Sequence, residues 1–114
     1  MKRIFILTVA LLIGCTTTVS STQSYRPANY PGAAWSIGAR AESGTLSVEI
    51  TVTINGQAIA NGTLSDLKPS DNFTGMFEGR NILAECSLVN TGQFTYGHEC
   101  IVFVDNERAA QLSF

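Results

Sequence analysis

Charged residues are scarce in this chain, and positive charge is the scarcest. The 114 residues include seven Lys and Arg, nine Asp and Glu, and one His, so the formal net charge is −2. The cations form no basic run, whereas tight nucleic-acid binding requires several contacts from Lys or Arg to phosphates. The composition therefore argues against a nucleic-acid partner, and equally against electrostatic docking onto anionic lipid.

Groups suited to catalysis or metal binding are also few. His98 is the only histidine, and the nine carboxylates are scattered along the chain. The sequence has no Gly-x-Ser-x-Gly elbow, no phosphate-binding loop and no dinucleotide fingerprint. Cys86, His98 and Cys100 together lack the fourth ligand that a zinc site requires. We therefore expect no enzyme, no cofactor and no metal site, and we expect His98 to lie half-buried beside a disulfide.

The chain has no long hydrophobic run. Its longest apolar segment is short and lies at the amino end. Lys2 and Arg3 precede the mostly apolar residues 4–13, and the run closes on Leu12-Ile13-Gly14-Cys15. A membrane span needs about 20 apolar residues. A charged start, a short apolar segment and a small residue at the cleavage site are instead typical of a secretory signal peptide.

The end of this run resembles the lipobox of bacterial lipoproteins, in which Leu, a variable residue and Gly or Ala precede an invariant Cys. The resemblance covers residues 1–15 only. It implies that residues 1–14 are a signal peptide, that Cys15 is lipidated, and that this lipid holds the protein to a membrane. Because Thr16 rather than Asp follows Cys15, the sorting rule of the family implies the outer membrane, at its periplasmic face. The alternative is an ordinary secretory signal followed by a cysteine that carries no lipid.

Composition divides the rest of the chain into a tether and one domain. Residues 16–24 carry no charge, and only Val19 among them has appreciable apolar surface. Burial of such a segment cannot offset its ordering entropy, and the prolines that follow it disfavour helix. We therefore expect a flexible tether over residues 15–32 and a single small β-domain over residues 33–114.

Two cysteines remain once Cys15 is assigned to lipid. In an oxidising compartment, two cysteines in one small domain indicate a disulfide, here between Cys86 and Cys100. Both lie at even positions of alternating segments and so face the same side. Pairing them across a hairpin requires a connection with an odd number of residues, which a turn around Gln93 provides.

Alternation of apolar and polar residues dominates the domain. Residues 46–54 alternate strictly, which is typical of a half-buried strand, and Asn55-Gly56 then predicts a two-residue type I′ hairpin. In that register Val52 faces Ile59, and a β-bulge at Asn61-Gly62 keeps Leu64 on the core side.

Similar patterns predict the other strands. They cover residues 35–41, 73–79, 80–89, 94–104 and 108–114, with a polar loop over residues 65–72. No segment has a convincing helical period. We therefore expect an all-β fold of six to seven short antiparallel strands with one disulfide, forming a small β-barrel or a two-layer β-sandwich.

Three aromatic residues, Tyr25, Tyr30 and Trp35, lie before or at the start of the domain. Tyr and Trp dominate interface hot spots, so these residues are candidates for binding a partner. In the alternative interpretation, Trp35 closes one end of the core and the tyrosines pack against it.

The leading functional hypothesis is a lipid-anchored, periplasm-facing envelope lipoprotein that acts as a protein-binding or structural accessory module. One alternative is a small β-barrel that binds an apolar ligand. Its lining would consist of Phe73, Met76, Phe77, Phe94 and Phe103. A less favoured alternative is an envelope hydrolase or inhibitor.

Overall fold

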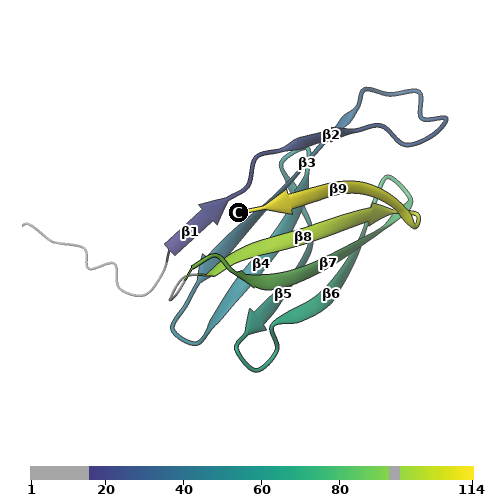
Figure 1. The fold of residues 1–114 in the computed structure, drawn as a ribbon. Coiled ribbons are helices and arrows are strands. Elements are labelled where there is room, and N and C mark those ends of the chain that lie inside the picture. Colours follow the sequence, from purple (N-terminus) through teal and green to yellow (C-terminus); the bar gives the residue numbers. More distant parts are fainter. Residues whose placement is uncertain (1–15, 93–95) are drawn as a thin grey trace, which may run out of the picture.

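Two antiparallel β-sheets make up the structure, a computed structural model that describes residues 16–92 and 96–114 (Figure 1). The first sheet contains β1 (Thr16–Val19), β2 (Gln23–Tyr25), β3 (Trp35–Ser43), β4 (Ser47–Ile54) and β5 (Gln57–Ser65). The second sheet contains β6 (Ser70–Phe77), β7 (Arg80–Asn90), β8 (Tyr96–Val104) and β9 (Glu107–Ser113). The predicted signal peptide over residues 1–14 and the predicted lipidation site Cys15 lie outside the described residues.

The two sheets pack as a sandwich. In the first sheet the strand order is β1-β3-β4-β5, with β2 also paired to β3, and in the second it is β6-β7-β8-β9. No hydrogen-bonded ladder among the described strands joins the sheets into a closed barrel. The all-β prediction with one disulfide is therefore confirmed, the sandwich alternative is favoured over the barrel, and the expected six to seven strands are in fact nine.

Alternate residues of the strands build one core between the sheets. In β4 the side chains of Val48, Ile50, Val52 and Ile54 are all buried, as the strict alternation predicts. The second sheet contributes residues of the same parity. They are Ile82, Ala84, Cys86, Cys100, Val102, Val104, Ala110 and Leu112.

The extra two strands arise from the segment expected to be a flexible tether. Residues 16–19 pair antiparallel with β3, from Thr16 opposite Ser43 to Val19 opposite Arg40, and β2 continues along the same edge. Between these two strands, Ser20 donates its backbone N–H to Ala39 O (2.8 Å), and its hydroxyl accepts from Ala39 N (2.9 Å). The expectation of a tether is wrong over this segment because backbone hydrogen bonds to an open strand edge need no apolar side chains.

A side-chain amide connects the same segment to the second sheet. Gln23 Nε2 donates to Gln111 O (2.7 Å), and Gln23 Oε1 accepts from Gln111 N (3.0 Å). This pair of bonds imitates a rung of a β-ladder on β9, which is an edge strand of its sheet. Residues 23–25 are therefore held by both sheets.

Three hairpins use the same kind of two-residue turn. Both central residues have positive φ at Asn55-Gly56 (53° and 81°), at Glu78-Gly79 (51° and 76°) and at Asp105-Asn106 (48° and 71°). Positive φ at both positions defines type I′, which matches the right-handed twist of the flanking strands. The predicted type I′ turn at Asn55-Gly56 is confirmed, with Ile54 opposite Gln57.

The bulge in the first of these hairpins lies closer to the turn than predicted. Val52 faces Ala60 rather than Ile59, so Ile59 is the extra residue and the proposed bulge at Asn61-Gly62 is wrong. Leu64 is nevertheless fully buried, because one extra residue anywhere before it restores the parity.

Gly62 on β5 and Gly75 on β6 lie where these two strands of different sheets approach each other closely. A Cβ on Gly62 would lie 2.1 Å from the Phe73 ring, and one on Gly75 would lie 2.1 Å from the backbone oxygen of Ile59. Only glycine permits approaches this close. The polar loop predicted here is shorter than expected, because β6 already begins at Ser70.

Strand pairing sets the two ends of the sandwich apart. The three type I′ turns and the connection between β2 and β3 lie toward one end (Figure 1). At the other end, Thr16 faces Ser43, Ser47 faces Ser65, and Asn90 faces Tyr96. We refer to this second end as the anchor-side end, after the lipid expected on the neighbouring Cys15, and define it by residues 16, 43–47, 65–69, 90–92 and 96.

Candidate functional site

The three aromatic residues identified in the sequence meet at the turn-bearing end of the sandwich. Trp35, the first residue of β3, has Tyr25, Tyr30 and Phe77 arranged edge-on around its ring. The ring centres lie 6.1, 5.6 and 4.9 Å from that of Trp35, respectively. Such edge-to-face arrangements suit the aromatic quadrupole and are favourable beyond the area they bury.

Carboxylates and one guanidinium complete this cluster. The Tyr25 hydroxyl donates to Glu107 Oε1 (2.6 Å), and the Tyr30 hydroxyl donates to Glu78 Oε1 (2.7 Å). Arg80 lies over the Tyr30 ring, 5.8 Å from its centre. We call this surface the aromatic end, defined by Tyr25, Tyr30, Trp35, Phe77, Glu78, Arg80, Asp105 and Glu107.

The tight turns position these charged groups. Asp105 N donates to Asn81 O (2.8 Å), and Asp105 Oδ1 accepts from Asn81 N (2.9 Å), which ties the β8–β9 turn to the start of β7. Arg80 then reaches the second carboxylate oxygen of Asp105 at 3.7 Å. The carboxylates therefore stand on short, hydrogen-bonded turns, which limits how far they move.

Trp35 is the buried part of this cluster. Its side chain is only 1% exposed, while Tyr25 and Tyr30 are half-buried. Trp35 Nε1 has no hydrogen-bond partner among the described residues. Of the three sequence-derived candidates, the two tyrosines present surface to solvent, and Trp35 holds their rings in place.

Sequence reasoning missed the polar half of the aromatic end. Glu78, Arg80, Asp105 and Glu107 come from two turns that lie 48 or more positions after the tyrosines in the sequence. The available signal was the pair of turn sequences, since consecutive hairpins of an antiparallel sheet place alternate turns at the same end.

The Tyr25 hydroxyl has a perturbed ionisation. Burial, followed by the hydrogen bond to Glu107 and its negative charge, raises the pKa of Tyr25 from its ordinary value of 10.0 to about 12. A raised folded-state pKa means that the neutral hydroxyl stabilises the fold fully below pH 10 and that this contribution is lost as the pH rises toward 12.

We expect an ultraviolet absorbance titration to contain a tyrosine phase centred near pH 12. Tyr25→Phe should remove that phase, because it deletes the hydroxyl held by Glu107. Tyr96→Phe, at an exposed position far from any of these groups, is the matched control and should leave the phase in place. If the phase near pH 12 persists in Tyr25→Phe, the assignment is wrong.

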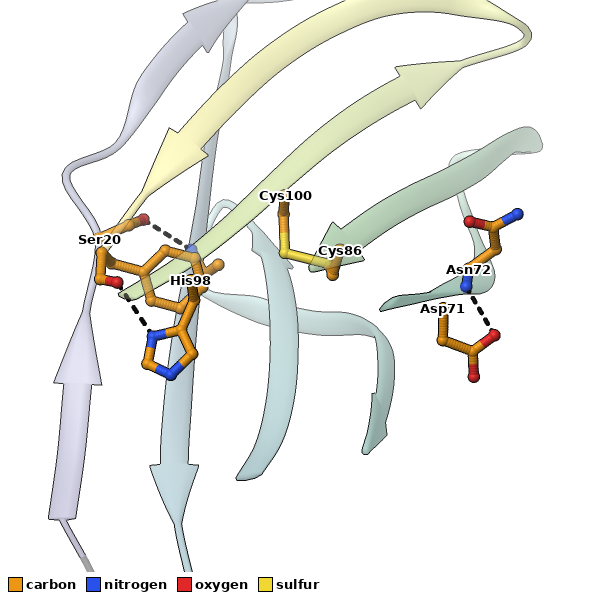
Figure 2. The surroundings of a disulfide bond; sticks show 8 residues. Ser20, Asp71, Asn72, Cys86, His98 and Cys100 are labelled. Atoms are coloured by element: carbon orange, nitrogen blue, oxygen red, sulfur yellow. Dashed lines mark hydrogen bonds between the residues drawn. A yellow bond between two sulfur atoms is a disulfide. The ribbon is translucent and has the colours of Figure 1, made fainter. Parts of the chain in front are cut away.

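The disulfide predicted from parity is present. Cys86 on β7 and Cys100 on β8 are direct cross-strand partners, with their Cα atoms 4.0 Å apart, and the bridge lies between the two strands (Figure 2). Both residues are buried within the core. The pair therefore links the two central strands of the second sheet.

His98 is held by the end of the last strand. Its Nδ1 lies 3.0 Å from Phe114 O, and its ring is 5.1 Å from the Phe114 ring. Since a carbonyl oxygen only accepts, Nδ1 is the donor in this bond. His98 is half-buried and lies two residues before Cys100 on β8 (Figure 2).

The sequence also contains a short motif with the spacing of catalytic residues, which the sequence analysis did not identify. Ser65-Asp66-Leu67-Lys68 has the Ser-x-x-Lys spacing of a known class of serine nucleophile. Here the four residues form a tight turn, closed by backbone bonds of 3.0 Å in both directions between Ser65 and Lys68. The Lys68 ammonium pairs instead with Asp71 at 3.0 Å. The ammonium is thus engaged away from the serine hydroxyl.

The side chains proposed to line an apolar cavity do not share one. Phe73 is buried against Gly62, Phe77 packs on Trp35, Met76 is exposed, and Phe103 points away from the buried residues on either side of it. Phe94 lies outside the described residues. Over the described chain, no group of three or more His, Cys, Asp or Glu is placed to hold a metal ion.

No helix among the described residues has the length and apolar character needed to cross a membrane. Comparisons with protein-family models, with curated proteins and with solved structures found no match to this chain.

Proposed function

We propose that this protein is a lipid-anchored envelope lipoprotein whose β-sandwich binds another protein through the aromatic end. In this proposal residues 1–14 are removed, Cys15 carries the lipid, and the domain faces the periplasm from the outer membrane. The lipobox resemblance of residues 12–15 supports the anchor. The binding role draws its support from the structure of the aromatic end.

One observation carries the binding role: two tyrosines stand half-exposed on a rigid base. Tyr30 packs on buried Trp35, donates to Glu78 and lies under Arg80. Tyr and Arg are the residue types that most often dominate interface energetics. A ring already fixed by packing and a hydrogen bond loses little conformational entropy when a partner covers it.

The chemistry of the remaining groups also favours binding over catalysis. His98 donates to Phe114, and Lys68 pairs with Asp71. Each is thus occupied by a structural partner, and residues 16–92 and 96–114 contain no arrangement of nucleophile and base of the kind that covalent catalysis requires.

Photo-cross-linking in cells tests the proposal. A photoreactive residue placed at Ala28, which is exposed in the connection between β2 and β3, should give one defined protein adduct. The same probe at Thr63, exposed on β5 away from the aromatic end, is the matched control and should not give that adduct. Adding Tyr30→Ala should lower the yield at Ala28 about tenfold, as expected for an interface hot spot.

Two results would contradict the proposal. Identical adducts from Ala28 and Thr63 would show that the aromatic end is not the contact surface. Mass spectrometry of the amino-terminal peptide tests the anchor separately, since an unmodified Cys15 would remove the lipoprotein part.

A further inference from the structure

The anchor-side end exposes apolar side chains at the tips of its turns. Leu46, in the connection between β3 and β4, is 86% exposed, and Leu67, in the tight turn between β5 and β6, is 96% exposed. Tyr96, at the start of β8, is 60% exposed. Single exposed apolar residues are common on soluble proteins. The exposure of these three residues therefore indicates a binding surface only together with their location.

Two of these residues, Leu46 and Tyr96, lie beside an opening into the core. A hollow of about 480 Å³ lies between the sheets at this end. Leu46 and Tyr96 stand on its rim, and Val48, Leu64 and Leu88 line it more deeply. Ser43, Gly44, Thr45 and Ser47 complete the rim, and the serine and threonine side chains provide hydroxyl groups close to the apolar tips.

The chain also leaves the described structure at this end. Thr16, the first described residue, is already paired to Ser43 in the β1–β3 ladder. Cys15 is its neighbour in the sequence, and one extended residue spans at most about 3.6 Å. A lipid on Cys15 therefore has no slack segment to separate it from residues 43–47.

We propose that the anchor-side end rests directly on the phospholipid surface, with Leu46, Leu67 and Tyr96 in the interfacial layer. This inference rests on the proposed lipid at Cys15. It fixes the orientation of the domain, because the aromatic end then points away from the membrane toward the periplasm. A partner held by the aromatic end would approach from that side.

A lipid surface fits this end better than another protein for a geometric reason. Any other occupant would have to lie between the bilayer and a turn held within one residue of the lipid attachment site. On that turn charge opposes the contact only at Asp66, because Lys68 pairs with Asp71 at 3.0 Å. Tyrosine is also enriched at membrane interfaces, where its ring meets lipid and its hydroxyl meets water.

Tryptophan depth measurement provides the test. The lipidated mature protein, with Leu46→Trp, is reconstituted in phosphatidylcholine vesicles containing brominated phosphatidylcholine. The new indole should emit at shorter wavelength than in detergent-free buffer and lose fluorescence to the bromines. Met76→Trp is the matched control, because Met76 is 61% exposed and lies on β6 next to Phe77 of the aromatic end. Its emission, like that of the native Trp35, should not be quenched.

The outcomes separate this inference from the proposed function. If Cys15 is lipidated and Leu46→Trp is quenched no more than Met76→Trp, the membrane contact is wrong while the anchored binding module stands. If Cys15 is unmodified, the membrane contact and the lipoprotein part of the proposed function are both wrong, while the binding role of the aromatic end is still decided by cross-linking at Ala28. If Leu46→Asp instead converts a dimer to a monomer, the anchor-side end is covered by a second copy, and the lipid contact is wrong. Leu67→Trp, at an independent turn, should repeat the result of Leu46→Trp.

Discussion

Replacing Trp35 with alanine should lower the free energy of unfolding by about 3–5 kcal/mol, the usual cost of truncating a buried tryptophan or phenylalanine. The side chain is 1% exposed and is enclosed by Tyr25, Tyr30 and Phe77. These three rings come from different segments, so they cannot all move inward to fill the space. Urea unfolding followed by far-ultraviolet circular dichroism measures the loss without requiring tryptophan fluorescence.

Two further variants make this result specific to the aromatic end. Trp35→Phe keeps most of the ring volume and removes the indole N–H, which has no partner in the described structure. It should therefore cost much less than Trp35→Ala. Met76→Ala, at an exposed position next to Phe77 on β6, should change stability by no more than about 0.5 kcal/mol. Equal losses for Trp35→Ala and Met76→Ala would contradict the assigned role.

The same substitution also bears on binding. If Trp35 positions the tyrosines, Trp35→Ala should reduce the adduct formed at Ala28 even under conditions where the domain remains folded. Trp35→Phe should restore much of that adduct, because phenylalanine still offers an edge to Tyr25 and Tyr30. A purely structural role would change stability without changing the adduct of the folded protein.

Local chemistry accounts for the parts of the fold that the sequence predicts well. The type I′ turn at Asn55-Gly56 needs only two residues that tolerate positive φ, and the strict alternation before it assigns the faces. The pairing of Cys86 with Cys100 follows from the assignment of Cys15 to lipid, and parity agrees with it, because residues with a period of two must face the same side to be bridged. Neither prediction requires knowledge of the second sheet.

Features that depend on how the sheets meet are not visible in the sequence. The strand formed by residues 16–19 is held by backbone bonds to β3, so its side-chain pattern carries almost no signal. The position of the bulge at Ile59 is tied to the crossing of β5 and β6, where Gly75 leaves room for the Ile59 carbonyl. The alternation of apolar residues requires one extra residue in β5 before Leu64, but it does not determine the position of that residue.

The candidate site shows the same division. Tyr25, Tyr30 and Trp35 are close in sequence, and their residue types alone identify them as candidates. Their carboxylate partners Glu78 and Glu107 come from the other sheet, and only the stacking of the two sheets brings them within 2.7 Å. A sequence of this kind therefore predicts the aromatic part of such a surface and not the groups that orient it.

Removing the disulfide with the double substitution Cys86→Ala and Cys100→Ala should lower the free energy of unfolding by about 3 kcal/mol, the value expected for closing a loop of about 15 residues. The two cysteines are separated by 14 positions in the sequence and join the central strands of the second sheet. For a domain of this size, each kcal/mol lowers the melting temperature by about 4–8 °C. Both values are accessible from urea and thermal unfolding of the oxidised protein and the variant.

The dependence of stability on urea distinguishes a lost cross-link from lost packing. Without the bridge the unfolded chain expands and exposes more surface, so the slope of unfolding free energy against urea should increase. Val102→Ala, which removes methyl groups from the same buried face of β8, is the matched control and should lower stability with an unchanged slope. An unchanged slope in the double variant would mean that the bridge does not restrict the unfolded chain.

Because Cys86 and Cys100 are 2% and 0% exposed, reductant alone should reach the bridge only when the second sheet opens. Reduction of the native protein should therefore accelerate with urea, and rapid reduction in its absence would contradict the buried position of the bridge.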